Sequence, residues 1–392
     1  MSKYIHGNLL RLRISNGKTQ EEIANEADIS LLAYRNIESG KSTPSINTLE
    51  SLAKVFNVSV AEFLKEINVI EAVRFRALKN KSIKKREEII YSVSTWLEDF
   101  NELIDKLNDN DKYTYKLKDL EGKYPDPKEM AKLVRKRFGD ADDPVRENEP
   151  IRDICGLLEF RAGIKVYAKE FNSDNFFGLS LKDSNNNRVI AINTWDRISV
   201  ERRIFTAAHE LGHILLHSNS YKANITDENE QEEKEADIFA SYFLMPEKEF
   251  INEWIKCDNC DFVDRVIKVK QIFRVSYKVV LYRLNEIFKK RNPKSNIWSK
   301  FYIEYAKKYK VKLSVKDEMQ SLDANTKELQ SLSSNFYFGR GIASLVKKAY
   351  YKKLITTNEG ARILGFSNIL EMQDLIKAWE LEEQMIKGND TF

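Results

Sequence analysis

Hydrophobic positions in residues 1–66 recur every three or four residues, within short stretches that polar turns separate. The apolar positions that share this spacing are Ile23, Ala24, Ala27, Tyr34, Ile37, Leu49, Leu52, Ala53 and Phe56. Because residues three and four apart lie on one face of a helix, the pattern predicts five short helices that pack together. Thr19 with Glu22 three residues later forms a capping box, which predicts that a helix begins there.

Residues 67–124 are rich in charge and form a predicted helical connector. A charged stretch at 81–88 precedes apolar positions at helical spacing through residue 100, which predicts amphipathic helices. The connector ends at Tyr124-Pro125-Asp126-Pro127, because each proline disfavours helix in the residue before it.

From residue 125 to residue 290 the pattern becomes a mixture of helical and extended segments. The predicted elements are helices at 128–138 and 151–162, strands at 164–168, 176–181 and 188–193, and helices at 199–217 and from 230 to Pro246. The polar run 183–187 has the composition of a turn, so a small antiparallel sheet is expected. This order of elements is α+β rather than alternating βαβ. Residues 291–392 read as helical and basic, and the whole chain is expected to be multidomain and mainly α.

Composition narrows the class of protein. The chain has 392 residues, 42% of them hydrophobic and 32% charged, which is typical of a folded globular protein. It has no apolar run long enough to cross a bilayer and no apolar start typical of a signal peptide, so we expect a cytoplasmic protein with no membrane partner. The three cysteines, Cys155, Cys257 and Cys260, are expected to be reduced thiols.

Charge gives no general argument for nucleic-acid binding. The formal net charge is +4, and residues 1–66 hold eight basic and eight acidic side chains. Any contact with DNA must therefore come from local segregation of charge.

The segment His209-Glu210-Leu211-Gly212-His213 indicates a metal site. Two imidazoles four residues apart lie on one face of a helix, within reach of a single Zn²⁺ ion. Glu210 projects beside them and can act as the general base toward water that the metal makes acidic. Peptide hydrolysis is the chemistry that this arrangement suits.

A third ligand is required, and the next predicted helix offers Glu233 and Asp237, which are again four residues apart. Glu233 would complete a two-His, one-Glu set that leaves a position open for water, and Asp237 would orient a ligating imidazole. Acidic residues are common from 227 to 235, so this second match could arise by chance. However, the chain has only four histidines, and three of them fall within nine residues. His217 lies two turns, about 12 Å of helix rise, from His209, so we expect it to support the site rather than to bind the ion.

The stretches 209–217 and 233–246 resemble the ImmA/IrrE family of metallopeptidases, and the resemblance spans roughly residues 125–290. It implies an α+β, zincin-like peptidase domain with zinc on His209, His213 and Glu233 and with Glu210 as the general base. Members of that family typically cleave a repressor protein. The sequence does not name the target.

Residues 5–65 resemble the XRE, or Cro/cI-type, helix-turn-helix family, on the pattern Ile37-Glu38-Ser39-Gly40-Lys41 with Pro44. The resemblance implies a double-stranded DNA operator as partner, and operator dimers are usual for such domains. The residues it places toward the bases are Leu31, Leu32, Arg35 and Asn36, and those it places toward phosphates are Gln20, Lys41 and Ser42. The two leucines donate no hydrogen bonds, so readout would be biased toward thymine methyl groups. A helical bundle that binds a protein partner is the alternative.

We therefore expect a cytoplasmic, zinc-dependent regulatory endopeptidase joined to its own DNA-binding domain. Its protein substrate would be a repressor, or this chain itself within 67–124. The alternative is a transcriptional repressor, or an antitoxin with a cognate toxin, whose zinc fold senses a signal without cutting. The C-terminal stretch 357–366 resembles a second helix-turn-helix fragment, but a helical cap on the peptidase domain is the preferred interpretation.

Overall fold

The structure is a computed structural model. It describes residues 4–15, 18–64, 72–77, 86–109, 113–124, 126–139, 149–173, 176–182, 187–218, 229–291, 296–313, 329–330, 332, 340–366 and 368–389. The chain forms two compact units, one of Met1–Val69 with Lys85–Glu98 and the other of Ile70–Lys84 with Asp99–Phe392. Residues 183–186 of the predicted turn lie outside the described part.

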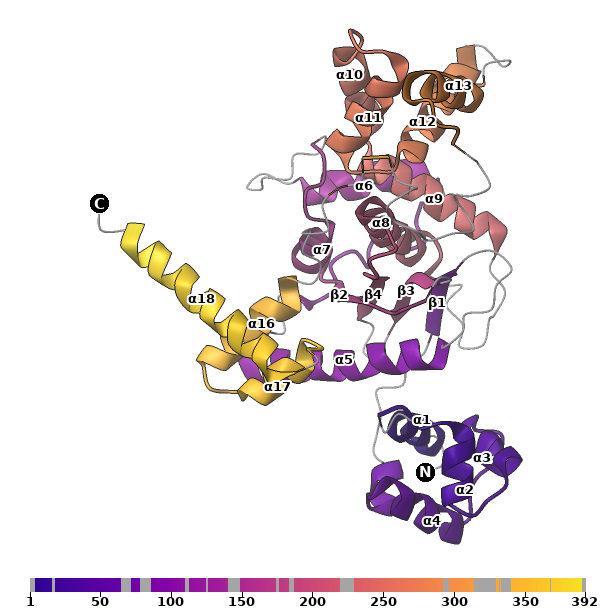
Figure 1. The fold of residues 1–392 in the computed structure, drawn as a ribbon, viewed down its shortest axis with the longest axis vertical. Helices are drawn as coiled ribbons and strands as arrows, with labels where there is room; N and C mark the ends of the chain where they lie inside the picture. Colours follow the sequence, from indigo (N-terminus) through magenta and orange to yellow (C-terminus); the bar gives the residue numbers. More distant parts are fainter. Residues whose placement is uncertain are drawn as a thin grey trace. The chain divides into compact units, whose positions relative to one another are not determined.

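The first unit contains the five short helices that the sequence predicts (Figure 1). They are α1 (Ile5–Ser15), α2 (Gln20–Glu26), α3 (Leu31–Glu38), α4 (Ile46–Phe56) and the 3₁₀ helix η2 (Val60–Leu64). Thr19, Ser30 and Ser45 cap α2, α3 and α4 by accepting a backbone N–H with the side-chain oxygen. A single apolar core, which includes Tyr34 and Phe63, holds these helices together.

The second unit is built on a four-stranded sheet with the strand order β1-β3-β4-β2. Its strands are β1 (Ala72–Ala77), β2 (Lys165–Lys169), β3 (Phe176–Lys182) and β4 (Arg188–Asn193). Strands β3 and β4 form the predicted antiparallel pair, but β2 pairs with β4 in parallel. The sheet is therefore mixed rather than antiparallel. Strand β4 lies between β2 and β3, parallel to β2 and antiparallel to β3.

Strand β1 corrects the prediction that the connector 67–124 is helical throughout. Residues 72–77 pair antiparallel with β3, whose residues follow about a hundred positions later in the chain. Local periodicity carries no information about so distant a pairing. The predicted amphipathic helix further along is present as α5 (Arg86–Leu107).

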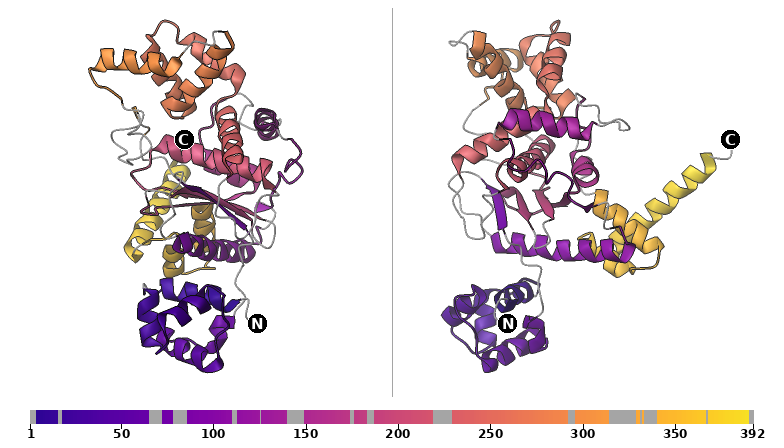
Figure 2. Two further views of the ribbon diagram at one scale, coloured as in Figure 1. Left: turned by 90° about the vertical axis from the view of Figure 1, so that its right-hand side faces the viewer. Right: turned by 180° about the vertical axis from the view of Figure 1, so that it is seen from behind.

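Helices cover the sheet of the second unit, as Figure 2 shows from two further sides. Helix α8 (Val200–Leu216) packs on β3 and β4, α9 (Glu230–Leu244) packs on α8, and α6 (Pro127–Phe138) packs on α9. The predicted helix at 151–162 is instead a short α7 (Ile154–Gly156) followed by the π-helical turn η4 (Leu157–Arg161). Wider turns of this kind depend on packing rather than on local sequence pattern.

The remaining helices of the unit are α10 (Glu247–Lys256), α11 (Phe262–Phe273), α12 (Tyr277–Arg291), α13 (Ile297–Tyr309), α16 (Arg340–Tyr351), α17 (Thr357–Ile363) and α18 (Ile369–Asn389). The last four lie in the C-terminal region 291–392, whose described part is mainly helical as predicted. Among the described helices, none combines the length and apolar character that a membrane span requires.

Candidate metal centre

Helix α8 carries both histidines of the predicted metal site. Ser199 caps its first turn by accepting the N–H of Arg202. His209 and His213 follow one turn apart and are almost fully buried, with exposed fractions of 1% and 2%. Their burial keeps bulk water from the two rings, so their nitrogens must find partners inside the protein.

The neighbouring helix α9 supplies the carboxylate. Gly212 lies where α9 crosses α8, and a Cβ there would stand 3.0 Å from Phe239 Cδ1 and 3.3 Å from Ala236 Cα. Glycine at this position therefore lets the two helices approach closely. The approach brings Glu233, in the first turn of α9, against the two imidazoles.

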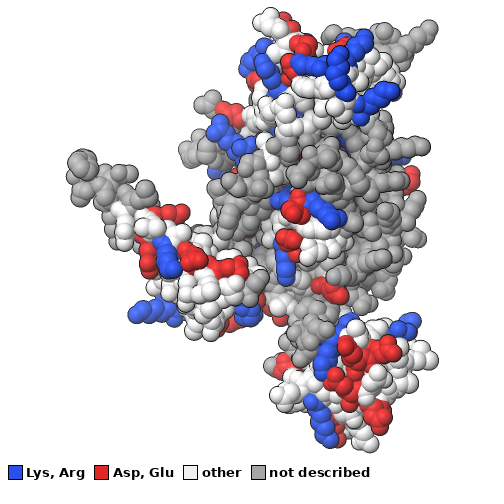
Figure 3. All heavy atoms as spheres, in the orientation of Figure 1, with Lys and Arg blue, Asp and Glu red and all other residues white. Residues whose placement is uncertain are grey.

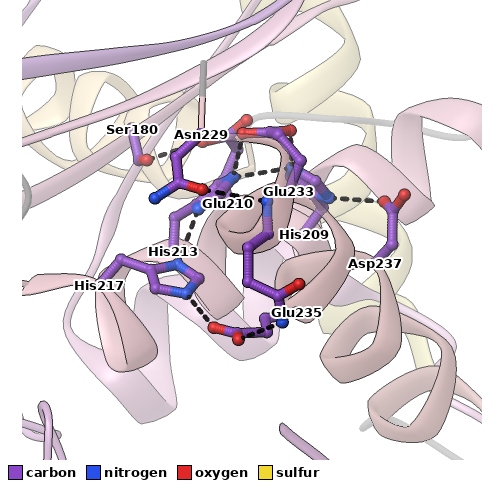
Figure 4. Close-up of polar contacts among 10 residues, drawn as sticks. Ser180, His209, Glu210, His213, His217, Asn229, Glu233, Glu235 and Asp237 are labelled. Carbon is purple, nitrogen blue, oxygen red and sulfur yellow. Dashed lines mark hydrogen bonds and ion pairs between the residues drawn. The ribbon is translucent and has the colours of Figure 1, made fainter. Parts of the chain in front are cut away.

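Three side chains converge on one point (Figure 4). The Nε2 atoms of His209 and His213 lie 2.9 Å apart. Glu233 Oε2 lies 3.2 Å from His209 Nε2, and Glu233 Oε1 lies 3.0 Å from His213 Nε2. Among the described residues, these three form the only group of at least three histidine, cysteine or acidic side chains placed to hold a metal ion.

The chemistry of this donor set fits a divalent cation. His209 Nδ1 lies 2.8 Å from Asp237 Oδ1, and an imidazole that donates its Nδ1–H to this carboxylate presents a lone pair at Nε2. Two such nitrogens and a carboxylate, all within a few ångströms, are the ligands that Zn²⁺ prefers. Burial alone would raise the pKa of Glu233, but its contacts with His209 and His213 outweigh burial and hold that pKa below the usual range.

A second chain of contacts holds the other imidazole. His213 Nδ1 lies 3.0 Å from His217 Nδ1, and His217 Nε2 lies 2.9 Å from Glu235 Oε2. If the carboxylate accepts from His217 Nε2–H, then His217 Nδ1 accepts from His213 Nδ1–H. This direction of donation leaves the Nε2 lone pair of His213 facing Glu233 and His209. Burial favours a higher pKa for Glu235, but the hydrogen bond from His217 lowers the pKa below its ordinary value.

Glu210 lies on the side of α8 that faces the sheet. Its Oε2 accepts a 2.6 Å hydrogen bond from Ser180 Oγ on β3. A Cβ on Gly178 would lie 2.4 Å from Thr206 Cγ2 and 3.7 Å from Glu210 Cγ, so only glycine lets β3 lie this close to α8. Sequence reasoning assigned no role to Ser180 or Glu235. A glycine inside a strand was the available signal for the first, because it marks close approach of the backbone.

The residues assigned to DNA contact gather around α3. Leu32 is 69% exposed, and Arg35 is exposed on the same helix, whereas Leu31 and Asn36 are half-buried. Lys41 and Ser42 are exposed in the turn that follows.

The amide of Gln20 is engaged within the domain, because it donates to the buried carboxylate of Glu38. The same carboxylate accepts from Arg13 Nε at 2.6 Å and from the Tyr34 hydroxyl at 3.0 Å. Gln20 therefore belongs to a network that fixes α3 in place. On the face that Figure 3 draws, acidic side chains gather near the middle of this unit and basic side chains lie around them.

Comparison with known proteins agrees with both parts of this description. Residues 160–285 match the peptidase-family model described as the IrrE N-terminal-like domain, and residues 9–63 match the model described as helix-turn-helix. A 79-residue stretch is 30% identical to the cryptic phage CTXphi transcriptional repressor RstR of Vibrio cholerae, and the alignment covers 20% of this chain and 71% of the repressor. The chain thus belongs, through its N-terminal domain, to the XRE-type helix-turn-helix family of DNA-binding regulators, and it carries an IrrE-like metallopeptidase-type domain further along the sequence.

Proposed function

We propose that this protein is a zinc-dependent endopeptidase that controls transcription. The observation that carries the proposal is the convergence of His209, His213 and Glu233, with Glu210 next to them on α8. Three protein ligands leave a fourth position on a tetrahedral ion for water or substrate, which is the arrangement of catalytic rather than structural zinc sites.

A bound Zn²⁺ ion would supply the Lewis acidity that polarises a peptide carbonyl and makes water acidic near neutral pH. The protein's own groups would do the remaining work. Glu210 accepts the proton of the attacking water and passes it to the leaving amine. Ser180 fixes the orientation of the Glu210 carboxylate by donating to Oε2. The other carboxylate oxygen, Oε1, would then be the one that accepts the proton. Asp237 and the pair of His217 with Glu235 orient the two ligating rings.

For the N-terminal domain we propose recognition of a double-stranded DNA operator by a homodimer. Helix α3 presents Leu32 and Arg35 at its surface, as a recognition helix must. The relative RstR is named a transcriptional repressor, which favours a role in transcription. We assign residues 1–66 to this domain, 67–124 to a connector, 125–290 to the peptidase domain and 291–392 to a helical C-terminal region.

The proposed substrate is a repressor protein, or this chain itself between residues 67 and 124. The second candidate function is a repressor whose zinc fold senses a signal without proteolysis. The likeness to RstR favours this alternative, because that protein is named a transcriptional repressor.

Glu210→Gln separates the two functions. The purified full-length chain, loaded with Zn²⁺, would be incubated alone and with unfolded casein, and the products would be identified by mass spectrometry. We expect Glu210→Gln to slow cleavage by a factor of about 10²–10⁴ while zinc content and DNA binding persist. Glu230→Gln, an equal change of charge at an exposed position of α9, is expected to cleave like the unsubstituted protein. Equal products from the Glu210→Gln variant and the unsubstituted protein would contradict the proposed peptidase activity.

A further inference from the structure

Strand β3 is the part of the sheet that touches the candidate centre. Ser180 Oγ donates to Glu210 Oε2 at 2.6 Å. Two residues earlier, a Cβ on Gly178 would reach to 3.7 Å from Glu210 Cγ. An extended segment paired with this stretch of β3 would therefore run past the carboxylate that we propose as the general base.

One edge of β3 is paired with β4, and the other edge is paired with β1. The antiparallel register sets Arg74 opposite Ser180 and Arg76 opposite Gly178. Adjacent strands lie about 4.8 Å apart. The backbone of β1 thus lies one strand spacing from the two residues of β3 that approach Glu210 (Figure 1).

Strand β1 comes from outside the peptidase-type domain. The family match covers residues 160–285, which include β3, β4, α8 and α9 but exclude 72–77. A sheet made of β2, β3 and β4 alone would leave the outer N–H and C=O groups of β3 open. Such an edge is where extended peptides add to a sheet as a further strand.

We propose that β1 is an autoinhibitory strand, which covers in cis the edge of β3 where an extended peptide segment docks for hydrolysis. This inference rests on the proposed peptidase function and defines its substrate as a segment that can adopt a strand and exchange with β1. In the chain, β1 begins at Ala72, shortly after the last helix of the helix-turn-helix domain ends at Leu64. The occupant of that edge in the resting protein is residues 72–77.

The test uses the full-length chain with Glu210→Gln, so that binding is measured without cleavage. Arg74→Pro with Phe75→Pro opens β1, because proline cannot donate to the ladder and neighbouring residues of a strand direct their N–H groups to opposite sides. Arg74→Lys with Phe75→Tyr is the matched control that retains a strand-compatible sequence. The probe is a fluorescent synthetic peptide with the sequence of residues 72–77.

We expect the proline variant to bind the peptide at least about 10-fold more tightly than the control, because β1 no longer competes for the edge. Hydrogen exchange measured by mass spectrometry should be faster over 176–182 in the proline variant and should slow again when the peptide is added. Equal affinity for the peptide in both variants, or unchanged exchange over 176–182, would overturn the proposal.

A second measurement needs no proline. In the Glu210→Gln chain with natural β1, saturating peptide should speed exchange over 72–77 while 176–182 stays protected, since one strand replaces the other. Unchanged exchange over 72–77 at saturation would equally overturn the proposal. None of these results depends on turnover, so failure of strand exchange is distinguishable from failure of the peptidase function.

Discussion

His213 Nδ1 lies 3.0 Å from Nδ1 of His217, so the histidine that directly follows α8 contacts the second imidazole rather than joining the cluster of ligand atoms. Glu235 accepts from the far side of His217 at 2.9 Å. The contact explains why three histidines at four-residue intervals can serve a single site. In the proposed site two of them would face a bound ion, and the third would set the orientation and the tautomer of its neighbour.

Glu235→Gln and His217→Ala are each expected to weaken zinc binding about 10- to 100-fold, because His213 loses the group that holds its ring. Competition with a chromophoric chelator measures the affinity. Glu230→Gln is the control, because Glu230 lies on α9 with Glu235. Unchanged zinc affinity in both variants would show that His217 and Glu235 do not support metal binding.

Arg35→Ala is expected to cost about 1–3 kcal/mol of specific DNA binding, because Arg35 is exposed on α3 and suited to a base edge. Fluorescence anisotropy with DNA from upstream of the gene measures this loss. Lys54→Ala removes an equal charge from an exposed position on α4 and serves as the control. If the two variants lose affinity for the DNA equally, Arg35 on α3 does not recognise the bases specifically.

A buried ion pair links the first turn of α8 to α11. Lys270 Nζ lies 2.9 Å from Glu201 Oε1, and both side chains are fully buried. Lys270→Met should lower the free energy of unfolding by about 3–5 kcal/mol, because it leaves Glu201 with a buried, uncompensated charge. Lys270→Met with Glu201→Gln should recover part of this loss in urea denaturation.

The exposed pair of Lys256 with Glu253 provides the contrast, because its lysine is 65% exposed. Lys256→Met should leave the urea midpoint almost unchanged, since water screens the pair. Similar midpoints for Lys256→Met and Lys270→Met would show that the buried pair does not stabilise the fold.

Glu159 predicts a dependence of stability on pH. Burial raises its pKa from 4.5 to about 8, although the N–H of Gly341 donates to Oε2 at 2.9 Å. The folded protein keeps this proton up to about pH 8, whereas the unfolded chain releases it near pH 4.5. The unfolded state therefore binds fewer protons between these values, and the contribution of Glu159 to stability falls as pH rises.

Glu159→Gln should remove a decline on the order of a few kcal/mol between pH 5 and pH 8. Urea unfolding at the two pH values gives the measurement. The same decline in the variant and in the unsubstituted protein would show that Glu159 ionises normally in the fold.

Much of the site could be predicted from sequence because its key distances lie within helices. Four-residue spacing alone puts His209 with His213, and Glu233 with Asp237, on shared faces. The pairing between these faces depends on how α9 crosses α8. That crossing depends on packing at Gly212. The sequence alone therefore offered no sign that Glu235 contacts His217.

The fold was predictable where an element depends only on residues that are neighbours in the sequence. The helix-turn-helix unit, α8, α9 and the β3–β4 pair appear where apolar periodicity placed them. Strand β1 and the parallel pairing of β2 depend on partners distant in the chain. Local pattern carries no signal for such partners, so these features required the structure.

Zinc content tests the central claim most directly. Inductively coupled plasma mass spectrometry of the purified full-length protein should find about one Zn²⁺ ion per chain, as a single site of three protein ligands requires. His213→Ala and Glu233→Ala should each lose nearly all of it, while Glu230→Ala should keep it. Retention of full zinc content by either ligand variant would contradict the assignment of the metal to His209, His213 and Glu233.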